Sequence, residues 1–440
     1  MKKIICVFLL LISSRAFGQP DDIHAMYYAK SITADDLRRH LFVLASDSFQ
    51  GRETASEGEK KAAAYIAAHF RNIGLQQSNN APDYYFPFSV YQDTVASCTL
   101  TFNQSTFQSG RDFYAPVNTN ETSSINNSQL VFIGYGISDS LYDEYKKADV
   151  KNKIVIALSG EPKKHKEFFL SGSNKESDWS RGLNKKANAA LAHGASALII
   201  INPQTETFSA NQLRQNQKSR IYLTKETSTK SIPVIVANSS TASHFFTAKQ
   251  YSKIKKAASK FKSGKSLTIN GNFNFNYTEQ TVKLPSQNII GFIEGTDLKD
   301  EYVILTAHYD HLGMHDGKIF YGADDDGSGT VTVMEMAKAF AQAKAENHGP
   351  RRSIVFMTVS GEEKGLLGSK YYTEHPAFPL EATLVNLNTD MVGRYDQEHE
   401  SDTNYVYLVG SDRMSSELHQ ISRSEEHTSE LQSRFGISYA

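Results

Sequence analysis

Cysteine is almost missing from this 440-residue sequence, which contains only two, Cys6 and Cys98. Cys6 lies in an N-terminal segment that we expect to be removed, which leaves Cys98 alone in the mature chain. A single cysteine excludes an internal disulfide bond. We therefore expect stability to come from burial of a hydrophobic core and from bound metal.

An excess of charge of one sign is also missing. The chain has 47 basic and 48 acidic residues, a formal net charge of -1. This balance removes the electrostatic argument for a nucleic-acid partner or an anionic membrane surface. The length allows two domains, and 40% hydrophobic with 22% charged residues is ordinary for a soluble globular protein. The composition therefore favours a small-molecule or peptide substrate.

No apolar run is long enough to cross a bilayer, which takes about 20 residues. Residues 4–12 form an unbroken apolar run, which Lys2 and Lys3 precede and Ala16-Phe17-Gly18 follows. This order is typical of a secretory signal peptide with a small-x-small cleavage site. The alternative is a buried N-terminal strand or helix. We predict a signal peptide over residues 1–18 and export to the periplasm or the extracellular space.

Short buried strands characterise the middle of the chain. Apolar runs at 131–133, 154–157, 197–201 and 232–236 alternate with Gly, Pro and charged turns. A helix is expected over 185–193, and the basic, polar residues 241–275 lead back out. We interpret residues 128–272 as an inserted β-rich domain. No internal repeat of about 20–50 residues is visible.

Helices and strands alternate in the rest of the chain. Two N-terminal helices are predicted. Thr33 marks the start of the first helix, and Gly74 marks the end of the second. After the insertion, strands are predicted at 288–293, 302–306, 353–358 and 383–387, with helices at 330–341 and 365–372. This alternation predicts an α/β fold, whose sites lie at the carboxyl ends of the strands.

Four short motifs follow predicted strands or begin a predicted helix. They are His308-x-Asp310, the turn Asp324-Asp325-Asp326 between glycines, the pair Glu362-Glu363, and Asp390. Crowded carboxylates raise one another's pKa unless cations neutralise them, and a divalent metal does this most directly. Imidazole with carboxylates suits zinc, and an acidic residue that is not a ligand can deprotonate the bound water.

Each motif alone has an ordinary interpretation. A histidine can be part of a core, an Asp run can cap a helix, a Glu pair can be solvated, and a single Asp can cap a turn. Their joint occurrence, in strand-end positions, favours a metal site.

Together the motifs resemble the co-catalytic zinc aminopeptidase family, whose relatives include bacterial leucyl aminopeptidase, glutamate carboxypeptidase and glutaminyl cyclase. The resemblance includes the stretch Glu362-Glu363-x-Gly365-Leu366-Leu367-Gly368-Ser369. It implies a three-layer α/β/α domain with a mostly parallel mixed sheet, and residues 128–272 resemble the protease-associated domain that is often inserted in it. The peptidase domain would comprise residues 19–127 and 273–422.

The resemblance also implies a role for each residue. His308 and Asp390 would bind one Zn²⁺ ion, Glu363 a second, and Asp325 would bridge the two. Glu362 would be the general base that takes a proton from the bridging water, and Asp310 would orient His308. The substrate would be a peptide.

The C-terminal region departs from the family pattern. The family has a further zinc-binding histidine downstream, whereas His419 and His427 come too soon and lack a preceding apolar strand. Residues 423–433 resemble a translated sequencing adapter, the alternative being a polar helical tail. We therefore expect a non-native tail over 423–440, an incomplete peptidase domain and poor activity.

The favoured function is that of a secreted zinc exopeptidase of the aminopeptidase type. A carboxypeptidase would need arginines to bind the substrate carboxylate, and Arg351-Arg352 leads into a strand instead. The alternatives are a carboxypeptidase-type enzyme, a one-metal glutaminyl cyclase, and an inactive homologue that only binds ligands. Side-chain preference and oligomeric state are not indicated by the sequence.

Overall fold

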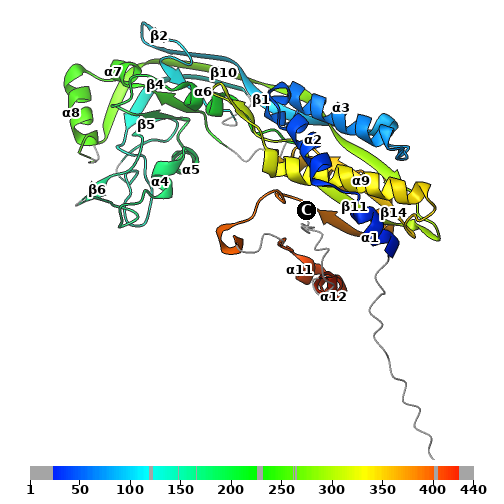
Figure 1. The fold of residues 1–440 in the computed structure, drawn as a ribbon. Helices are drawn as coiled ribbons and strands as arrows, with labels where there is room; N and C mark the ends of the chain where they lie inside the picture. The colour runs from blue at the N-terminus through cyan, green and yellow to red at the C-terminus, as the bar shows by residue number, and fades with distance from the viewer. Residues whose placement is uncertain are drawn as a thin grey trace, which may run out of the picture. The chain divides into compact units, whose positions relative to one another are not determined.

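The computed structural model describes residues 23–117, 122–146, 148–164, 166–224, 231–260, 262, 265–400 and 405–425. The expected signal peptide, residues 426–440 of the expected tail and His427 lie outside these ranges. None of the helices within them has the length and apolar character needed to cross a membrane. The chain forms two compact units, described separately below: unit 1 comprises Met1–Phe88 and Ser286–Ala440, and unit 2 comprises Ser89–Pro285 (Figure 1).

A mixed, mostly parallel sheet forms the centre of unit 1. Its strand order is β15-β11-β14-β10, with β1 beside β10. Strand β11 is parallel to β14 and β15, and β14 is antiparallel to β10. Strand β14 and the second half of β11 are almost entirely buried, because both faces of the sheet are covered there. The bounds are β11 Leu298–His308, β14 Arg352–Val359 and β15 Thr383–Asn388, while β1 Tyr85–Phe102 and β10 Leu267–Ile293 have only their residues up to 88 and from 286 in unit 1.

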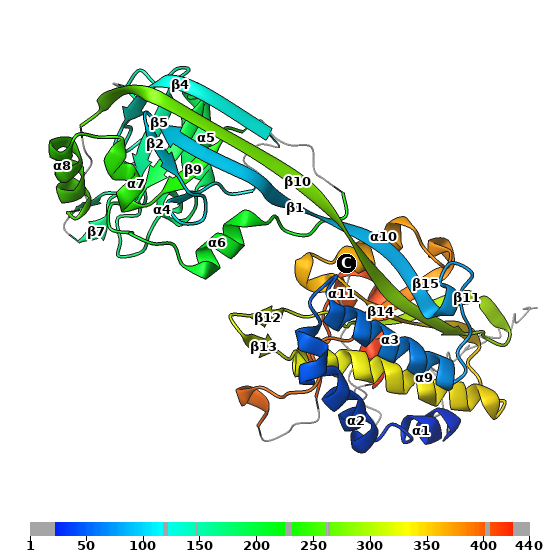
Figure 2. The same cartoon turned by 90° about the horizontal axis from the view of Figure 1, so that it is seen from above.

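Helices cover both faces of this sheet. Alternate strand residues point to opposite faces: Leu305 and Phe356 belong to the core with α3 and α9, while Ile304 and Val355 pack with Tyr372 of α10. Figure 2 shows α3 and α9 side by side along the sheet. The expected α/β class, with its three layers and mostly parallel sheet, is confirmed. The helix bounds are α2 Ala34–Leu44, α3 Glu57–Asn72, α9 Gly329–Ala345 and α10 Leu367–Glu374.

Two helices of unit 1 begin with side-chain caps, of which that of Thr33 was predicted and that of Ser56 was not. The backbone N–H of Asp36 donates to Oγ1 of Thr33 over 3.2 Å, and that of Glu59 donates to Oγ of Ser56 over 3.3 Å. Each bond satisfies an N–H group that has no partner inside the helix. The remaining elements of unit 1 are α1 Ile23–Ala29, η1 Asp47–Arg52, η2 Pro82–Tyr84, β12 Gly313–His315, β13 Lys318–Phe320, η3 Ala323–Ser328, η4 Glu362–Lys364, η5 Leu380–Ala382, η6 Gln397–His399, α11 Ser411–Met414 and α12 Ser416–Glu425.

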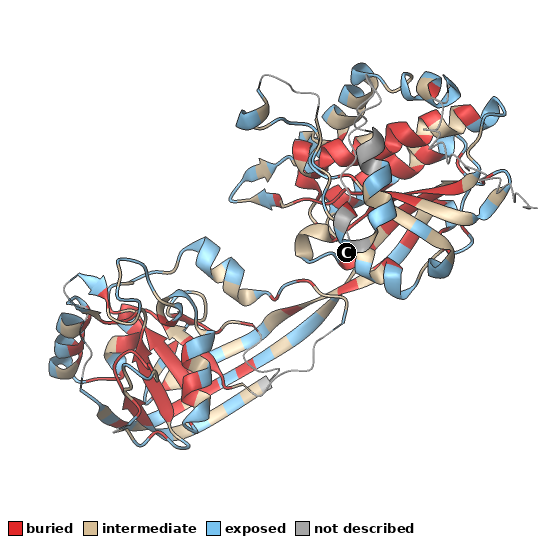
Figure 3. Cartoon of the chain, turned by 90° about the horizontal axis from the view of Figure 1, so that it is seen from below, coloured by how far each residue is buried: buried red, intermediate tan, exposed pale blue. Residues whose placement is uncertain are grey.

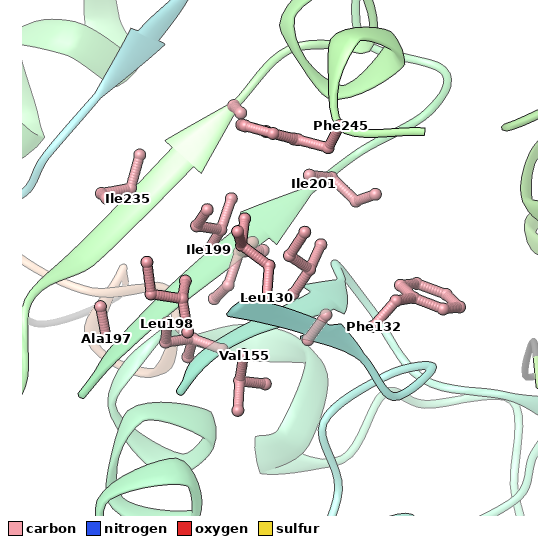
Figure 4. Close-up of a cluster of buried hydrophobic side chains, with 14 of the residues drawn as sticks. Leu130, Phe132, Val155, Ala197, Leu198, Ile199, Ile201, Ile235 and Phe245 are labelled. Atoms are coloured by element: carbon pink, nitrogen blue, oxygen red, sulfur yellow. The ribbon is translucent and has the colours of Figure 1, made fainter. Parts of the chain in front are cut away.

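Unit 2 also contains a parallel sheet. Strands β4 Thr122–Phe132, β5 Ile154–Leu158, β8 Ala197–Ile201 and β9 Val234–Ala237 are parallel to one another, and β3 Phe113–Tyr114 closes the β9 side antiparallel. Every residue of β5 and β8 is buried (Figure 3). Figure 4 shows Leu198 and Ile199 in this aliphatic core.

Helices are more extensive in unit 2 than the sequence suggests. The polar segment expected to lead back out contains α7 Ser239–His244 and α8 Ala248–Ala258. Thr247 begins α8 with a reciprocal capping box to Gln250, and Tyr251, Ile254 and Ala258 form its buried face. The other elements are β2 Ser105–Phe107, β6 Lys163–Lys164, β7 Glu167–Phe168, α4 Asp178–Arg181, α5 Asn184–Ala192 and α6 Ala210–Gln217. That residues 128–272 are a protease-associated domain stays a prediction.

Candidate metal centre

Three neighbouring parallel strands of unit 1 end in metal-binding residue types. In the strand register His308 lies opposite Val359, and Thr306 lies opposite Asn388, so β11, β14 and β15 end at the same edge. His308 is the last residue of β11, Glu362 follows β14 by three residues, and Asp390 follows β15 by two. The sheet therefore gathers these groups from three separate parts of the sequence, as strand ends of α/β sheets generally do.

The three consecutive aspartates before α9 have different environments. Asp326 is fully buried, and its carboxylate accepts N–H bonds from His308 (3.2 Å), Gly329 (2.8 Å) and Met391 (3.2 Å). Asp324 accepts the N–H of Gly393 over 2.9 Å. Only Asp325 has a substantially exposed side chain, at 40%. The outer two aspartates thus anchor the turn to neighbouring segments, and Asp325 is left to bind a ligand.

The first potential ligand set is the predicted trio His308, Asp325 and Asp390. One ligand atom from each lies within 4.8 Å of the others. Nε2 of His308 is 3.2 Å from Oδ1 of Asp325 and 3.9 Å from Oδ2 of Asp390. The structure therefore brings these predicted ligands together around one point.

The second potential set contains a residue that the sequence analysis missed. His311, Asp325 and Glu363 also place ligand atoms within 4.8 Å of one another. Nδ1 of His311 is 2.7 Å from Oε1 of Glu363 and 3.9 Å from Oδ1 of Asp325. The signal was present, because His311 directly follows the His308-x-Asp310 motif. Gly322 has a positive φ of 57° and lies so close that an added Cβ would be 2.5 Å from the His311 ring.

Buried polar atoms without partners show whether the residues fit a metal. Nδ1 of His311 and Oε1 of Glu363 are both buried, and neither has a hydrogen bond of acceptable geometry among the described residues. Such atoms are rare in native proteins unless an ion or water satisfies them. Imidazole nitrogens and carboxylate oxygens are ligands that zinc prefers. The residues therefore fit a pair of metal positions that share Asp325.

The electrostatics of the centre favour added positive charge. Burial lowers the pKa of His308, but the hydrogen bond to Asp325 and the carboxylates of Asp326 and Asp310 raise it more, to about 10. Burial also raises the pKa of Glu362 and of Asp390. A proton on His308 thus offsets the crowded carboxylates, and a divalent cation would do so more effectively.

Asp310 links the centre to the turn that carries Glu362. Its backbone carbonyl lies 3.0 Å from Nδ1 of His308, whereas its carboxylate Oδ1 is 3.8 Å away. The carboxylate accepts the hydroxyl of Thr54 over 2.6 Å and the N–H of Glu362 over 3.1 Å. Asp310 is thus placed to orient His308 through its carbonyl and Glu362 through its side chain. Oε2 of Glu362 is 3.7 Å from Nε2 of His308.

Arg52 connects the loops that flank His311. Its buried guanidinium donates to the carbonyls of Tyr309 (2.7 Å), Leu44, Tyr321 and Gly322 (each 2.8 Å). Burial lowers the pKa of Arg52 to about 10, which leaves it charged at neutral pH. That Arg52 bonds these four carbonyls could not be predicted from the sequence, because all four acceptors are backbone atoms and no residue type marks them.

A pocket of about 220 Å³ adjoins the first ligand set. His308, Glu362 and Asp390 line it together with apolar side chains such as Met357 and Leu366. None of its fifteen lining residues is Lys or Arg, and the full set is Ile304, Thr306, His308, Met357, Val359, Glu362, Leu366, Ser369, Tyr372, Thr373, Leu380, Thr383, Asn386, Asn388 and Asp390. The pocket therefore combines acidic groups with an apolar wall.

Comparisons with known proteins connect this centre with a peptidase family. Residues 288–435 match the family model described as Peptidase family M28. Aminopeptidase YwaD of Bacillus subtilis (strain 168) is 35% identical over 141 residues, which cover 30% of this chain and 28% of that protein. A probable glutamate carboxypeptidase of Arabidopsis thaliana is 36% identical over 121 residues, or 27% of this chain and 17% of that protein. The chain thus spans less than a third of these relatives.

A solved structure described as a zinc aminopeptidase, BSAP from Bacillus subtilis, is also similar. The similarity has a TM-score of 0.45 at 23% sequence identity, and it covers 89% of this chain and 76% of that chain.

Proposed function

Because residues 288–435 match peptidase family M28, we propose that this chain is a zinc-dependent aminopeptidase that removes N-terminal residues from peptides. The observation that carries the proposal is the convergence of two His-carboxylate sets on Asp325, with Glu362 beside them. An aminopeptidase of Bacillus subtilis is among the relatives. The geometry of the centre supports a proposal for the number of ions and for the role of each residue.

The two ligand sets would hold two ions. His308, Asp325 and Asp390 would bind the first, and His311, Asp325 and Glu363 the second. Zinc, when bound, supplies Lewis acidity that polarises the scissile carbonyl and lowers the pKa of water. His311, which directly follows the His308-x-Asp310 motif, would thus provide an imidazole for the second position.

Glu362 would be the general base. It is close to the first ligand set, with Oε2 3.7 Å from Nε2 of His308, but neither ligand set includes it. Its backbone N–H bonds to Asp310, which fixes the turn that carries it. The carboxylate accepts a proton from the attacking water and passes it to the amine of the leaving peptide.

The pocket favours aminopeptidase over carboxypeptidase activity. A substrate carboxylate would need a cationic partner, and the lining residues include no Lys or Arg. The Glu362 carboxylate that lines the pocket would instead repel a substrate carboxylate. The apolar wall suits an aliphatic first side chain, so leucine should be preferred over glutamate at this position.

The test is the substitution Glu362→Gln, measured as hydrolysis of leucine p-nitroanilide together with zinc content by mass spectrometry. Loss of the base should lower kcat/KM by about 100- to 10,000-fold, while zinc content stays the same. The exposed Glu374→Gln in α10 is the matched control and should keep full activity. Unchanged activity of Glu362→Gln, or a protein that binds no zinc, would refute the proposal.

We also propose that the protein is exported, on the basis of the charged, apolar and small-residue pattern of residues 1–18. Intact-mass measurement after expression in a bacterium should give a chain that begins just after Gly18. A periplasmic fraction without the protein would contradict export.

A further inference from the structure

A second group of metal-binding residue types lies among the helices of unit 1. His40 is in α2, His69 is near the end of α3, and Glu335 is in α9. One ligand atom from each lies within 4.8 Å of the others, the same limit that the two sets at the strand ends satisfy. The three residues share no member with those sets, so the group needs its own explanation.

Hydrogen bonds to the other ring nitrogens leave one nitrogen of each histidine for a ligand. Nε2 of His69 lies 3.1 Å from the carbonyl oxygen of Met334. A carbonyl only accepts, so Nε2 carries the proton and Nδ1 keeps its lone pair. Nδ1 of His40 lies 2.7 Å from the hydroxyl of Tyr65, which leaves Nε2 facing Glu335. Metal-binding histidines are usually oriented in this way by a second partner.

Glu335 has a buried oxygen without a hydrogen bond. Its side chain is 1% exposed, and Oε2 accepts from Lys338 over 2.9 Å. Oε1 lies 3.0 Å from Nε2 of His40, yet no donor among the described residues reaches it with acceptable geometry. Oε1 of Glu363 and Nδ1 of His311 are in the same condition at the strand-end centre. A buried carboxylate oxygen in this state indicates a missing partner.

We propose that His40, His69 and Glu335 bind a separate divalent ion, zinc by its ligand chemistry, which ties α2 and α3 to α9. Two imidazoles and one carboxylate are a known protein ligand set for zinc, with a fourth position left to water. The side chain of His40 is 12% exposed, so water can reach the group. Lys338 bonds the other oxygen of Glu335 and Asp36, and therefore does not occupy the ligand position.

The role of the ion would be structural. Helix α9 begins directly after the turn that carries Asp325, and its first residue, Gly329, bonds to Asp326. An ion that fixes α9 to α2 and α3 would therefore hold the helix from which this turn extends. Metal that binds only the folded chain stabilises it in proportion to the logarithm of the metal concentration.

The experiment isolates the helix group by working in a chain with Asp325→Asn, which removes the ligand shared by the two strand-end sets. Zinc is stripped with a chelator, and zinc is then titrated by calorimetry and by thermal unfolding. We expect one ion per chain and a rise in Tm of about 5 °C at a hundredfold excess over Kd. Adding His69→Gln should abolish zinc binding and the rise in Tm. His348 is an exposed histidine of unit 1, and adding His348→Gln should change neither zinc binding nor the rise in Tm.

Further variants keep the proposal open to refutation. His40→Gln should also remove the ion, and Co²⁺ should give the visible absorption of a tetrahedral nitrogen-oxygen site only when both histidines are present. Circular dichroism of the metal-free variants should match that of the metal-free parent, which rules out a folding defect. Equal zinc binding with and without His69 would overturn the proposal. This result would not touch the proposed peptidase function, whose test uses Glu362→Gln in the otherwise unaltered chain.

Discussion

Units 1 and 2 both contain parallel strands but differ in the residues at the carboxyl ends of these strands. In unit 1 these ends carry His308, Glu362 and Asp390. In unit 2, β5 is followed by Ser159 and β9 by Asn238. Both sheets have strands with buried, aliphatic side chains. Parallel strands alone therefore do not make a site, and the residues placed at the strand ends decide where chemistry can occur.

The polar groups at the strand ends of unit 2 bond to the backbone. Lys186 donates to the carbonyls of Leu158 and Gly160 over 2.7 and 2.6 Å. Asn238 accepts the N–H of Thr241 over 2.9 Å and thereby begins α7. Within the described ranges, all three His-carboxylate sets lie in unit 1. The comparison predicts that substitutions at strand ends affect peptide hydrolysis in unit 1 and only stability in unit 2.

The largest expected effect comes from Asp325→Asn, because this carboxylate belongs to both strand-end ligand sets. Its loss should weaken both zinc positions and reduce peptide hydrolysis by about 1,000-fold or more. Activity on leucine p-nitroanilide and zinc per chain are the measurements. Asp316→Asn, in the turn between β12 and β13, is the control and should retain both. Full zinc content in Asp325→Asn would show that Asp325 is not a required zinc ligand, which would contradict the assigned difference between the strand ends of units 1 and 2.

Arg52→Lys should have the next largest effect. A lysine ammonium cannot reach all four carbonyls that the guanidinium bonds, and each buried carbonyl left unpaired costs about 1–3 kcal/mol. We expect unit 1 to lose about 3 kcal/mol of unfolding free energy, and hydrolysis to fall because the loops beside His311 move. Urea unfolding followed by circular dichroism should detect the loss.

The two units can be separated in that measurement. The only tryptophan of the chain, Trp179, is buried in unit 2, so its fluorescence reports unfolding of unit 2. The fluorescence midpoint should stay unchanged in Arg52→Lys. Arg38→Lys, exposed on α2, is the control for both signals. A shift in the tryptophan midpoint would show that the units do not unfold independently.

Thr54→Val should have a smaller effect on the same centre. The Thr54 hydroxyl is buried and donates to Asp310 over 2.6 Å, so its removal loosens the carboxylate that holds the Glu362 turn. Partners of this kind typically contribute about 10- to 100-fold, and we expect about a tenfold loss of kcat/KM with little change in KM. Thr296→Val, exposed and outside the centre, should behave like the parent. A rise in KM alone would instead indicate substrate contact.

Much of unit 1 could be predicted from the sequence because the signals are local. Thr33 caps a helix, apolar runs form strands, and a metal-binding residue type ends or follows each of three strands. The sheet register then brings together the strand ends that carry His308, Glu362 and Asp390. The roles of these residues stay predictions until the substitutions are measured.

The remainder depends on contacts that no local pattern records. Arg52 bonds only to backbone carbonyls, and His40, His69 and Glu335 meet because three helices pack together. The sequence also does not show which of three adjacent aspartates points outward, because burial of Asp326 comes from the loop after β15 as well as from α9. In unit 2, α8 was missed since its buried face has only three apolar residues.

Lys186→Met should have the smallest effect on peptide hydrolysis. It tests the prediction that substitutions near the strand ends of unit 2 affect only stability. Burial lowers the pKa of Lys186 to about 7, whereas the unfolded chain keeps the ordinary value of 10.5. Between these values the unfolded state binds the extra proton, so the stability of unit 2 should rise with pH, by up to about 1.4 kcal/mol per pH unit. In Lys186→Met this rise should disappear, and in Lys249→Met, exposed on α8, it should remain. Urea unfolding followed by Trp179 fluorescence at pH 7, 8 and 9 measures this change in stability.

Because Lys186 bonds only to carbonyls of its own unit, peptide hydrolysis by Lys186→Met at pH 7 should match that of the parent. A loss of hydrolysis in the folded variant would mean that unit 2 contributes to the chemistry after all.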